Sequence, residues 1–491
     1  MSLLKNLSKD TLIYGVGTVI QRIIGFVLLP FYTRALLPSE YGVLDTLATF
    51  AYFVSTIFGL GIAGATSRYF FIAENEDEKK KLLYTSATIR LISYLFPLII
   101  LVVFSAETSI LLFDTEKYRW VIVATAFLIY FSSQQEIQSQ IFRFYREPLR
   151  FTFVTLLKTV INPVSGIMLV VVLQWGVLGA TLASLITSVV TFVFAYLYYT
   201  RKKYIRQFSW FWAKKMLKFG FPLIFTSILT WVNSVSDRIF LLHYKDLSEI
   251  GLYSIGNMFS QPVLLVNLAI SMGSMVFVMS MYSEEKEADK LKTKAFLTKI
   301  WYIYLAIAIT IASGISIFSY DIVHFVTTPA YISGILAIPF LLFGHILYMS
   351  TDMTGNGMTL KEQSKPYTWI MLIAAATNFG LNFYFVPNFG FVGAAITTIT
   401  SNIIYFFIAY YWSQKVFYIK RSIIKPALFF LIGLTIAVFF PFYELKIGGH
   451  ISFFIKIAVL ITVTTLPFVF KLIDFASIIN LLNSVKQRMK E

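Results

Sequence analysis

Apolar runs of about 20 residues recur along the whole of this chain, and a run of that length is what an α-helix needs to cross a bilayer. Only 13% of the residues are charged, whereas a soluble domain carries about 25%. The runs are continuously apolar rather than alternating in short segments, which favours helices over a β-barrel. The sequence therefore predicts an all-α integral membrane protein.

Fourteen transmembrane helices are predicted from these runs. They are expected near 11–36, 40–64, 82–105, 119–142, 150–173, 177–200, 216–243, 249–281, 296–319, 331–351, 366–387, 390–413, 423–441 and 451–471. The first run has no small-residue cleavage site and is followed by thirteen more, so we interpret it as a retained span rather than a signal peptide.

Basic residues are distributed unequally between the two sides that these spans define. If the N-terminus is cytoplasmic, the inward segments hold 31 of the 41 Lys and Arg residues and the outward segments hold 5. Positive charge collects on the cytoplasmic side of membrane proteins, so both termini are predicted to be cytoplasmic, in a multi-pass protein of the cytoplasmic (inner) membrane. The same asymmetry explains the net charge of +16, and no nucleic-acid partner is expected.

Several kinds of chemistry are excluded by composition. Cysteine is absent, which excludes disulfides and thiolate catalysis. The four histidines match no metal-ligand spacing, and no Gly-Lys dipeptide is present to form an ATPase-type phosphate loop. The short loops between spans leave no room for a soluble catalytic domain. The sequence predicts a transporter that is not an enzyme and has no cofactor, with Na⁺ or H⁺ coupling left open.

Two pairs of short motifs indicate an internal repeat. Ser39-Glu40-Tyr41-Gly42-Val43 resembles Ser248-Glu249-Ile250-Gly251-Leu252, and Gly176-Val177-Leu178-Gly179-Ala180 resembles Gly390-Phe391-Val392-Gly393-Ala394. Each pair occupies equivalent positions in two sets of six spans. Six is an even number, so the two sets are expected to share one orientation in the membrane and to be related by an axis along its normal.

The repeat predicts a division of the chain into three parts. An N-lobe is expected at 1–208, a C-lobe at 209–415, and the last two spans with a cytoplasmic tail at 416–491. Two pseudo-symmetric six-helix lobes around a central cavity transport a substrate by rocking against each other about a site near the midplane.

Several of these motifs also carry a family resemblance. The first span contains Gln21-Arg22-Ile23-Ile24-Gly25-Phe26 and Arg34-Ala35-Leu36, and the seventh contains Phe219-Gly220-Phe221-Pro222 and Ser236-Asp237-Arg238, followed by Ile250-Gly251-Leu252-Tyr253. Over essentially its whole length the chain resembles the polysaccharide transporter family of the multidrug/oligosaccharidyl-lipid/polysaccharide exporter superfamily, which includes the O-antigen and teichoic-type flippases.

The resemblance implies a substrate and partners. It implies translocation of an undecaprenyl-diphosphate-linked oligosaccharide from the cytoplasmic to the outer leaflet, alongside a polysaccharide polymerase and glycosyltransferases. Fourteen spans are also similar to the lipid II flippase and its sporulation relatives, in which the last two helices help to form a groove for the lipid tail. Multidrug exporters of the superfamily usually have twelve.

Three basic residues within the first spans are candidates to bind the diphosphate, because ionisable groups inside a membrane are costly and mark function. Arg22 lies about 17 Å into the first span, too deep for easy snorkelling, and its guanidinium suits phosphate oxygens. Arg90 and Lys158 lie about 12 Å deep. For each residue the alternative is structural: a carboxylate or carbonyl partner for Arg22, and snorkelling to the surface for the other two.

Polar residues elsewhere complete the predicted site. Gln134 and Glu136 belong to a polar stretch in the fourth span that is expected to line a cavity or reach water. Asp237 and Arg238 are expected to form either a structural ion pair that fixes their helix against a neighbour or a gating pair; alternatively, Asp237 is a proton or sodium site with Arg238 near the substrate. Asn162 and Asn378 mark corresponding helices and offer either a cation-binding opening or a simple interhelical hydrogen bond.

Two other functions remain open from the sequence. A multidrug-type exporter driven by sodium or protons would favour a cleft rich in carboxylates and aromatic residues. A membrane glycosyltransferase or polymerase would usually carry its chemistry on a long external loop, and this chain has only short ones.

Overall fold

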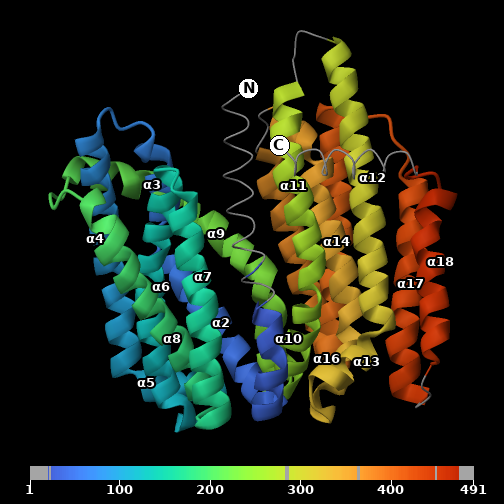
Figure 1. Ribbon diagram of the computed structural model, residues 1–491, viewed down its shortest axis with the longest axis horizontal. Coiled ribbons are helices and arrows are strands. Elements are labelled where there is room, and N and C mark those ends of the chain that lie inside the picture. The colour runs from blue at the N-terminus through green and yellow to red at the C-terminus, as the bar shows by residue number, and fades with distance from the viewer. Residues whose placement is uncertain (1–19, 21–23, 282–286, 362–364, 448–450, 475–491) are drawn as a thin grey trace. The chain divides into compact units, whose positions relative to one another are not determined.

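The computed structural model describes residues 20, 24–281, 287–361, 365–447 and 451–474, and Figure 1 shows their arrangement. Within this part of the chain every regular element is a helix. The chain forms two compact units, Met1–Gly251 and Leu252–Glu491. The lobes expected from the repeat at 1–208, 209–415 and 416–491 stay a prediction.

The first unit begins with the helical segment Ile24–Ala35. Its further helices are α2 (Pro38–Phe58), α3 (Ile62–Phe70), α4 (Glu76–Val103), α5 (Ser105–Phe113), α6 (Arg119–Phe144), α7 (Pro148–Gly166), α8 (Gly176–Ala195) and α9 (Trp210–Tyr244). Two π-helical turns, Ile167–Val172 and Tyr196–Thr200, extend α7 and α8, and two short 3₁₀ turns lie at Glu116–Tyr118 and Arg201–Lys203.

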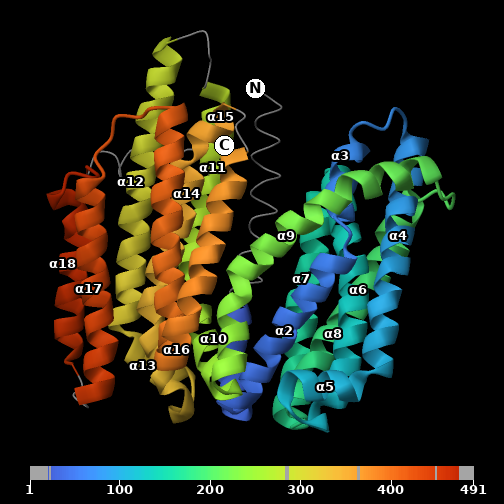
Figure 2. The ribbon, with the colours of Figure 1, turned by 180° about the vertical axis from the view of Figure 1, so that it is seen from behind.

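Helix α10 (Leu247–Phe259) joins the two units along the chain. The second unit continues with α11 (Gln261–Met281), α12 (Glu287–Ile317), α13 (Ser319–Val326), the 3₁₀ segment Pro329–Ala337, α14 (Ile338–Thr354), α15 (Asn356–Leu360), α16 (Lys365–Val416), α17 (Ile424–Ile447) and α18 (Phe453–Val469). Figure 2 shows the same helices from behind.

The helices have the length and composition of membrane spans. Among the described residues, nine helices are long and apolar enough to cross a bilayer, and two shorter apolar helices lie at Ile24–Ala35 and Phe453–Val469. The stretch Thr368–Val416 has 49 residues and is interrupted at Gly390, where φ is 56°, so it contains two of the predicted spans. The chain is an all-α multi-pass membrane protein, and the number of fourteen crossings stays a prediction.

Two predicted spans are broken by local geometry that the apolar pattern does not reveal. The span expected at 40–64 ends at Phe58, because Leu60 (φ 50°) and Gly61 (φ 62°) adopt left-handed conformations before α3 starts. A Cβ atom at Gly61 would lie 2.2 Å from the carbonyl oxygen of Gly220 on α9, so only glycine fits this close approach. The span expected at 249–281 is similarly divided at Ser260, between α10 and α11.

The core of the first unit is built by the apolar faces of α2, α4 and α6. Val43 and Ile122 are fully buried there, and Tyr94 packs among them while its hydroxyl donates to the carbonyl oxygen of Ser55 at 3.0 Å. Helix α4 begins at Glu76 rather than at residue 82, because the side chain of Asn75 accepts a hydrogen bond from the Glu78 N–H at 2.9 Å and caps the helix.

The first pair of repeated motifs meets at a crossing of α2 with α10. A Cβ atom on Gly42 would lie 1.8 Å from the carbonyl oxygen of Leu247, and one on Gly251 would lie 2.0 Å from that of Pro38. Each glycine therefore lets its helix approach the backbone of the other helix. Small residues at helix contacts serve this purpose in membranes, where burial of apolar surface adds little to helix association.

We predict that Gly42→Ala and Gly251→Ala each destabilise the protein by about 1–3 kcal/mol, because the added methyl group overlaps a backbone carbonyl. Thermal unfolding in detergent measures the effect. Gly380→Ala is the matched control, since no atom lies within 4 Å of its added Cβ. Variants at 42 and 251 as stable as this control would show that the crossing is not tightly packed.

Candidate transport site

A cavity of about 370 Å³ lies inside the first unit, between the segment Ile24–Ala35 and helices α6, α7 and α8. Ile24, Gly25, Leu28 and Pro163 form its apolar lining. Its polar lining consists of Gln135, Lys158, Thr159, Asn162, Ser184, Thr187 and Ser188. Among the described residues, the lining of the cavity thus combines hydroxyl and amide groups with one basic side chain.

Helical periodicity explains why these polar side chains converge. Lys158 and Asn162 are four residues apart on α7, and Ser184 and Ser188 are four apart on α8, so each pair lies on one helix face. The two faces meet where Asn162 Nδ2 donates to Ser184 Oγ at 3.4 Å. Of the predicted alternatives for Asn162, the structure contains this interhelical hydrogen bond, and it also places the residue on the cavity wall.

Among the described residues that line the cavity, Lys158 is the one with a charged side chain. It is partly buried, and no other described residue forms an ion pair or hydrogen bond with it. An ammonium group in such surroundings lacks the partner that normally offsets its desolvation, so an anion entering the cavity would be attracted to it.

Arg90 and Glu136, two other predicted site residues, form an ion pair between α4 and α6. Arg90 Nη2 lies 2.6 Å from Glu136 Oε2. The arginine side chain is only 2% exposed, whereas that of Glu136 is 51% exposed. The positive charge is therefore inside the helix packing, and the carboxylate reaches it from the surface of the unit.

The polar stretch of α6 divides its side chains between two environments. Gln134 is buried and donates to Ser133 Oγ at 3.2 Å, and it is not part of the cavity lining. Its neighbour Gln135 lines the cavity and contacts Thr191 of α8 through a short hydrogen bond. Gln135 was missed among the candidates, because the direction of each side chain depends on how α6 is rotated against α8.

Arg238 forms an ion pair with Asp45 of α2. Arg238 Nε lies 2.6 Å from Asp45 Oδ2 and joins α9 to α2. Asp237, the adjacent residue, is buried at 5% exposure. The structural interpretation of Arg238 as a residue that fixes its helix against a neighbour agrees with this geometry.

Asn378 takes part in a buried polar chain of the second unit. Asn382 Nδ2 donates to Asn378 Oδ1 at 3.1 Å, and Thr397 Oγ1 donates to Asn382 Oδ1 at 2.6 Å. All three residues are at most 2% exposed. No cluster of His, Cys, Asp or Glu side chains suited to a metal occurs among the described residues.

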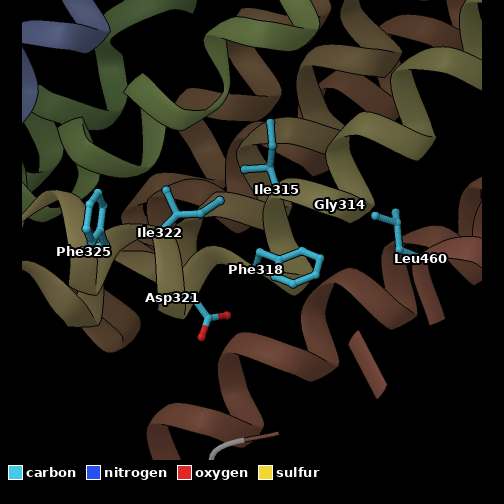
Figure 3. A pocket seen from close by; sticks show the side chains of 7 residues that line it. All are labelled: Gly314, Ile315, Phe318, Asp321, Ile322, Phe325 and Leu460. Atoms are coloured by element: carbon cyan, nitrogen blue, oxygen red, sulfur yellow. The ribbon is translucent and has the colours of Figure 1, made fainter. Parts of the chain in front are cut away.

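A buried ionic cluster in the second unit was not among the sequence candidates. Lys456 of α18 is 1% exposed, lies 2.7 Å from Glu444 of α17, and also pairs with Asp321 of α13. Asp321 lines an otherwise apolar pocket of about 470 Å³. Figure 3 shows this pocket, whose apolar lining includes Phe318 and Leu460. The sequence signal for this cluster was Lys456, a lysine within the span expected at 451–471.

Arg22, the remaining predicted site residue, lies outside the described residues. The structure thus brings Lys158 and Asn162 together at one cavity. It pairs Arg90 with Glu136 and Arg238 with Asp45, and it places Asn378 in a separate buried chain.

Comparisons with known proteins identify the family. The family described as polysaccharide biosynthesis protein matches residues 7–283, which is more than half of the chain. The chain belongs to this family. A Haemophilus influenzae protein named for the Lsg locus is similar to this chain, with 24% identity over 408 residues. The matched region covers 79% of this chain and 94% of the relative.

Solved structures of transporters share the fold of this chain. The lipid II flippase MurJ, in an inward closed conformation, matches with a TM-score of 0.73 and 19% identity over 95% of this chain and 100% of its own. An inward-facing MATE family multidrug resistance transporter of the MOP superfamily matches with a TM-score of 0.63 and 14% identity, over 80% and 94% of the two chains.

The match confirms the polysaccharide family to which the motifs pointed, and the solved structures show that the chain shares their fold. These two structural neighbours are described as a lipid flippase and a multidrug resistance transporter.

We predict that removing either partner of the Arg90–Glu136 pair has an unequal effect. Glu136→Ala leaves a buried guanidinium without a counter-charge and should cost about 3–5 kcal/mol of stability. Arg90→Met should cost less, because the carboxylate left behind is half exposed. The double variant should resemble Arg90→Met alone.

Chemical or thermal unfolding in detergent measures these differences. The exposed pair Lys79–Glu76, at 2.8 Å, is the matched control, and breaking it with Glu76→Ala should change stability by about 0–1 kcal/mol. Equal losses for Glu136→Ala and Glu76→Ala would contradict the inference that burial of the arginine makes its pair important.

Proposed function

We propose that this protein is a flippase that moves an undecaprenyl-diphosphate-linked oligosaccharide from the inner to the outer leaflet of the cytoplasmic membrane, for cell-surface polysaccharide biosynthesis. The observation that carries the proposal is Lys158, a basic group without a partner among the described residues, on the wall of a cavity that also presents hydroxyl and amide groups. The family membership supports it. A diphosphate needs positive charge, and sugars need hydrogen-bonding groups.

In this proposal the diphosphate binds Lys158 and Arg22. Ile24 and Gly25, which follow Arg22 in the sequence, line the same cavity as Lys158. Arg90, Glu136, Gln134 and Arg238 are engaged with other side chains, so we propose that they hold the walls of the transport path rather than bind phosphate.

Alternating access is the proposed mechanism, with fourteen spans forming two six-helix lobes around a central cavity and two further helices at the C-terminus. The two motif pairs support this division. Gly176 and Gly390, which open the second pair of motifs, have φ values of 54° and 56°. Three residues later, a Cβ at Gly179 would lie 2.9 Å from the carbonyl oxygen of Leu169, and one at Gly393 would lie 2.1 Å from that of Phe385.

Partners and orientation follow from the same proposal. The lipid-linked glycan must be assembled by glycosyltransferases before it crosses and be used afterwards, which fits a polysaccharide polymerase on the outer side. The excess of Lys and Arg in alternate loops supports cytoplasmic N- and C-termini.

A multidrug-type exporter is the second candidate function. The similarity to a MATE family transporter favours it. A cationic drug would need carboxylates in its path, however, and the lining of the cavity around Lys158 contains none. Lining chemistry therefore favours an anionic substrate.

We predict that Lys158→Met reduces flipping of a lipid-diphosphate-linked oligosaccharide in proteoliposomes by at least about tenfold, since the anion loses its charged partner in a site of low dielectric. Lys158→Arg should retain most of the activity. Lys117→Met, in a segment predicted to face outward, is the control and should leave flipping unchanged. Full flipping by Lys158→Met would remove the phosphate-binding role of this residue.

Coupling to Na⁺ or H⁺ is proposed at the chain Asn378–Asn382–Thr397, with Asp237 as a further candidate. Buried amide and hydroxyl oxygens suit a hard monovalent cation better than a proton, since none of the three chain residues titrates near neutral pH. Coupling to sodium at Asn378, Asn382 and Thr397 can therefore be distinguished from coupling to a proton at Asp237.

We predict that Asn378→Ala abolishes any stimulation of flipping by a Na⁺ gradient, whereas Asp237→Asn abolishes stimulation by a proton gradient. Transport into proteoliposomes with each gradient imposed separately measures this. Asn388→Ala is the control on the same helix, because Asn388 is exposed and donates only to the Tyr384 carbonyl oxygen. Unchanged gradient responses in both variants would exclude these residues from coupling.

A further inference from the structure

The segment from Arg201 to Phe221 carries a large excess of positive charge. No acidic residue occurs between Glu147 and Asp237, an interval that includes this whole segment. Six exposed basic side chains lie on it: Arg201, Lys202, Arg206, Lys214, Lys215 and Lys218. None of the six forms an ion pair with another described residue. These six positive charges are therefore available to bind a partner other than the described residues of the protein.

Two carboxylates that contact this segment are already engaged with other side chains. Lys203 of the same segment pairs with Glu147 at 3.1 Å. On α4, Glu78 accepts from Trp212 Nε1 at 2.8 Å and pairs with Lys81 at 3.3 Å. The six exposed bases are left without such a neutralising group.

Helix α9 places lysines and aromatic rings on one outward face. Trp210, Lys214, Lys218 and Phe221 follow a helical spacing of three to four residues, and the two aromatic side chains are 70% and 62% exposed. Lys215 Nζ lies 4.1 Å from the centre of the exposed Phe211 ring.

The opposite face of the same turns is buried against the rest of the unit. Trp212 and Met216 pack there with residues of α3 and α4, and the first turns of α9 lie beside those helices in Figure 2. The orientation of α9 about its own axis is thus fixed, and the basic aromatic face points away from the first unit.

The length of α9 exceeds the thickness of the bilayer core, so part of the helix can lie in the headgroup region. With 35 residues the helix is about 52 Å long, whereas the hydrocarbon core is about 30 Å thick. The exposed apolar surface continues beyond Phe221 to Phe225, which is 61% exposed, so the basic face borders a surface suited to lipid tails. Aromatic rings and lysines at this depth are typical of the headgroup region.

We propose that the face formed by Arg201, Lys202, Arg206, Lys214, Lys215 and Lys218, together with Trp210 and Phe211, binds the headgroups of anionic phospholipids. The aromatic rings lie at the level of the headgroups and the unpaired bases contact their phosphates. This surface is distinct from the cavity around Lys158, and the inference does not depend on which substrate the protein moves.

The test places a fluorescence donor next to this face. The chain has no cysteine, so Gln207→Cys, at an exposed position, accepts a thiol-reactive donor at a single site. The full-length protein is reconstituted in phosphatidylcholine nanodiscs with a small fraction of acyl-chain-labelled phosphatidylglycerol or acyl-chain-labelled phosphatidylcholine as acceptor. Energy transfer then reports the local preference for the anionic lipid.

We expect greater transfer to phosphatidylglycerol than to phosphatidylcholine, and a loss of this preference in high salt. In K214Q/K215Q/K218Q the preference should fall at least about threefold, because each basic residue near a charged surface contributes substantially. K214R/K215R/K218R should keep it. K79Q/K80Q/K81Q is the matched control and should also keep it, since Lys79 and Lys81 are already paired with Glu76 and Glu78.

Equal transfer to both lipids in the unsubstituted protein would overturn the proposal, and would instead fit a protein partner for this face. A preference that survives in K214Q/K215Q/K218Q, or that falls equally in K79Q/K80Q/K81Q, would also overturn it. If K214Q/K215Q/K218Q does not fold, the proposal is still tested by comparing the two lipids in the unsubstituted protein and in K214R/K215R/K218R.

Discussion

A charge inside an apolar bundle of helices must be paired or solvated, because an isolated buried ion costs several kcal/mol. Most of the intramembrane charges described here meet this condition through side chains on other helices, as in Arg90–Glu136, Arg238–Asp45 and Lys456–Glu444. Lys158 differs, since it faces a polar cavity and has no partner in the described part of the chain. This contrast separates the groups that hold helices together from the group available to a substrate.

The paired charges and the glycine contacts act on the same helices. Helix α2 is joined to α9 through Asp45 and Arg238, and it crosses α10 where Gly42 and Gly251 allow the backbones to touch. The lipid-headgroup surface that we infer lies at the other end of α9. Helix α9 thus carries both the surface that we infer for lipid headgroups and the ion pair with α2.

The apolar runs predicted the helices well, because the bilayer thickness sets their length and lipid excludes polar surface from it. They did not predict the break at Leu60 and Gly61, which depends on contact with Gly220 far along the chain. The sequence also identified Arg90 and Glu136 as unusual without showing that they meet, and it chose Gln134 where Gln135 lines the cavity. Pairing and side-chain direction depend on how helices rotate against one another, and a single sequence contains little information about that.

Substrate protection of the cavity tests the central claim most directly. Ser184→Cys places one thiol on the cavity wall of the cysteine-free chain, four residues from Ser188 and beside Asn162. A membrane-impermeant thiol reagent should label it in proteoliposomes, and an undecaprenyl-diphosphate-linked oligosaccharide should slow the labelling, while the same glycan without lipid and diphosphate should not. Labelling that is absent, or unaffected by the lipid-linked substrate, would contradict the account of a water-filled cavity that binds a lipid diphosphate.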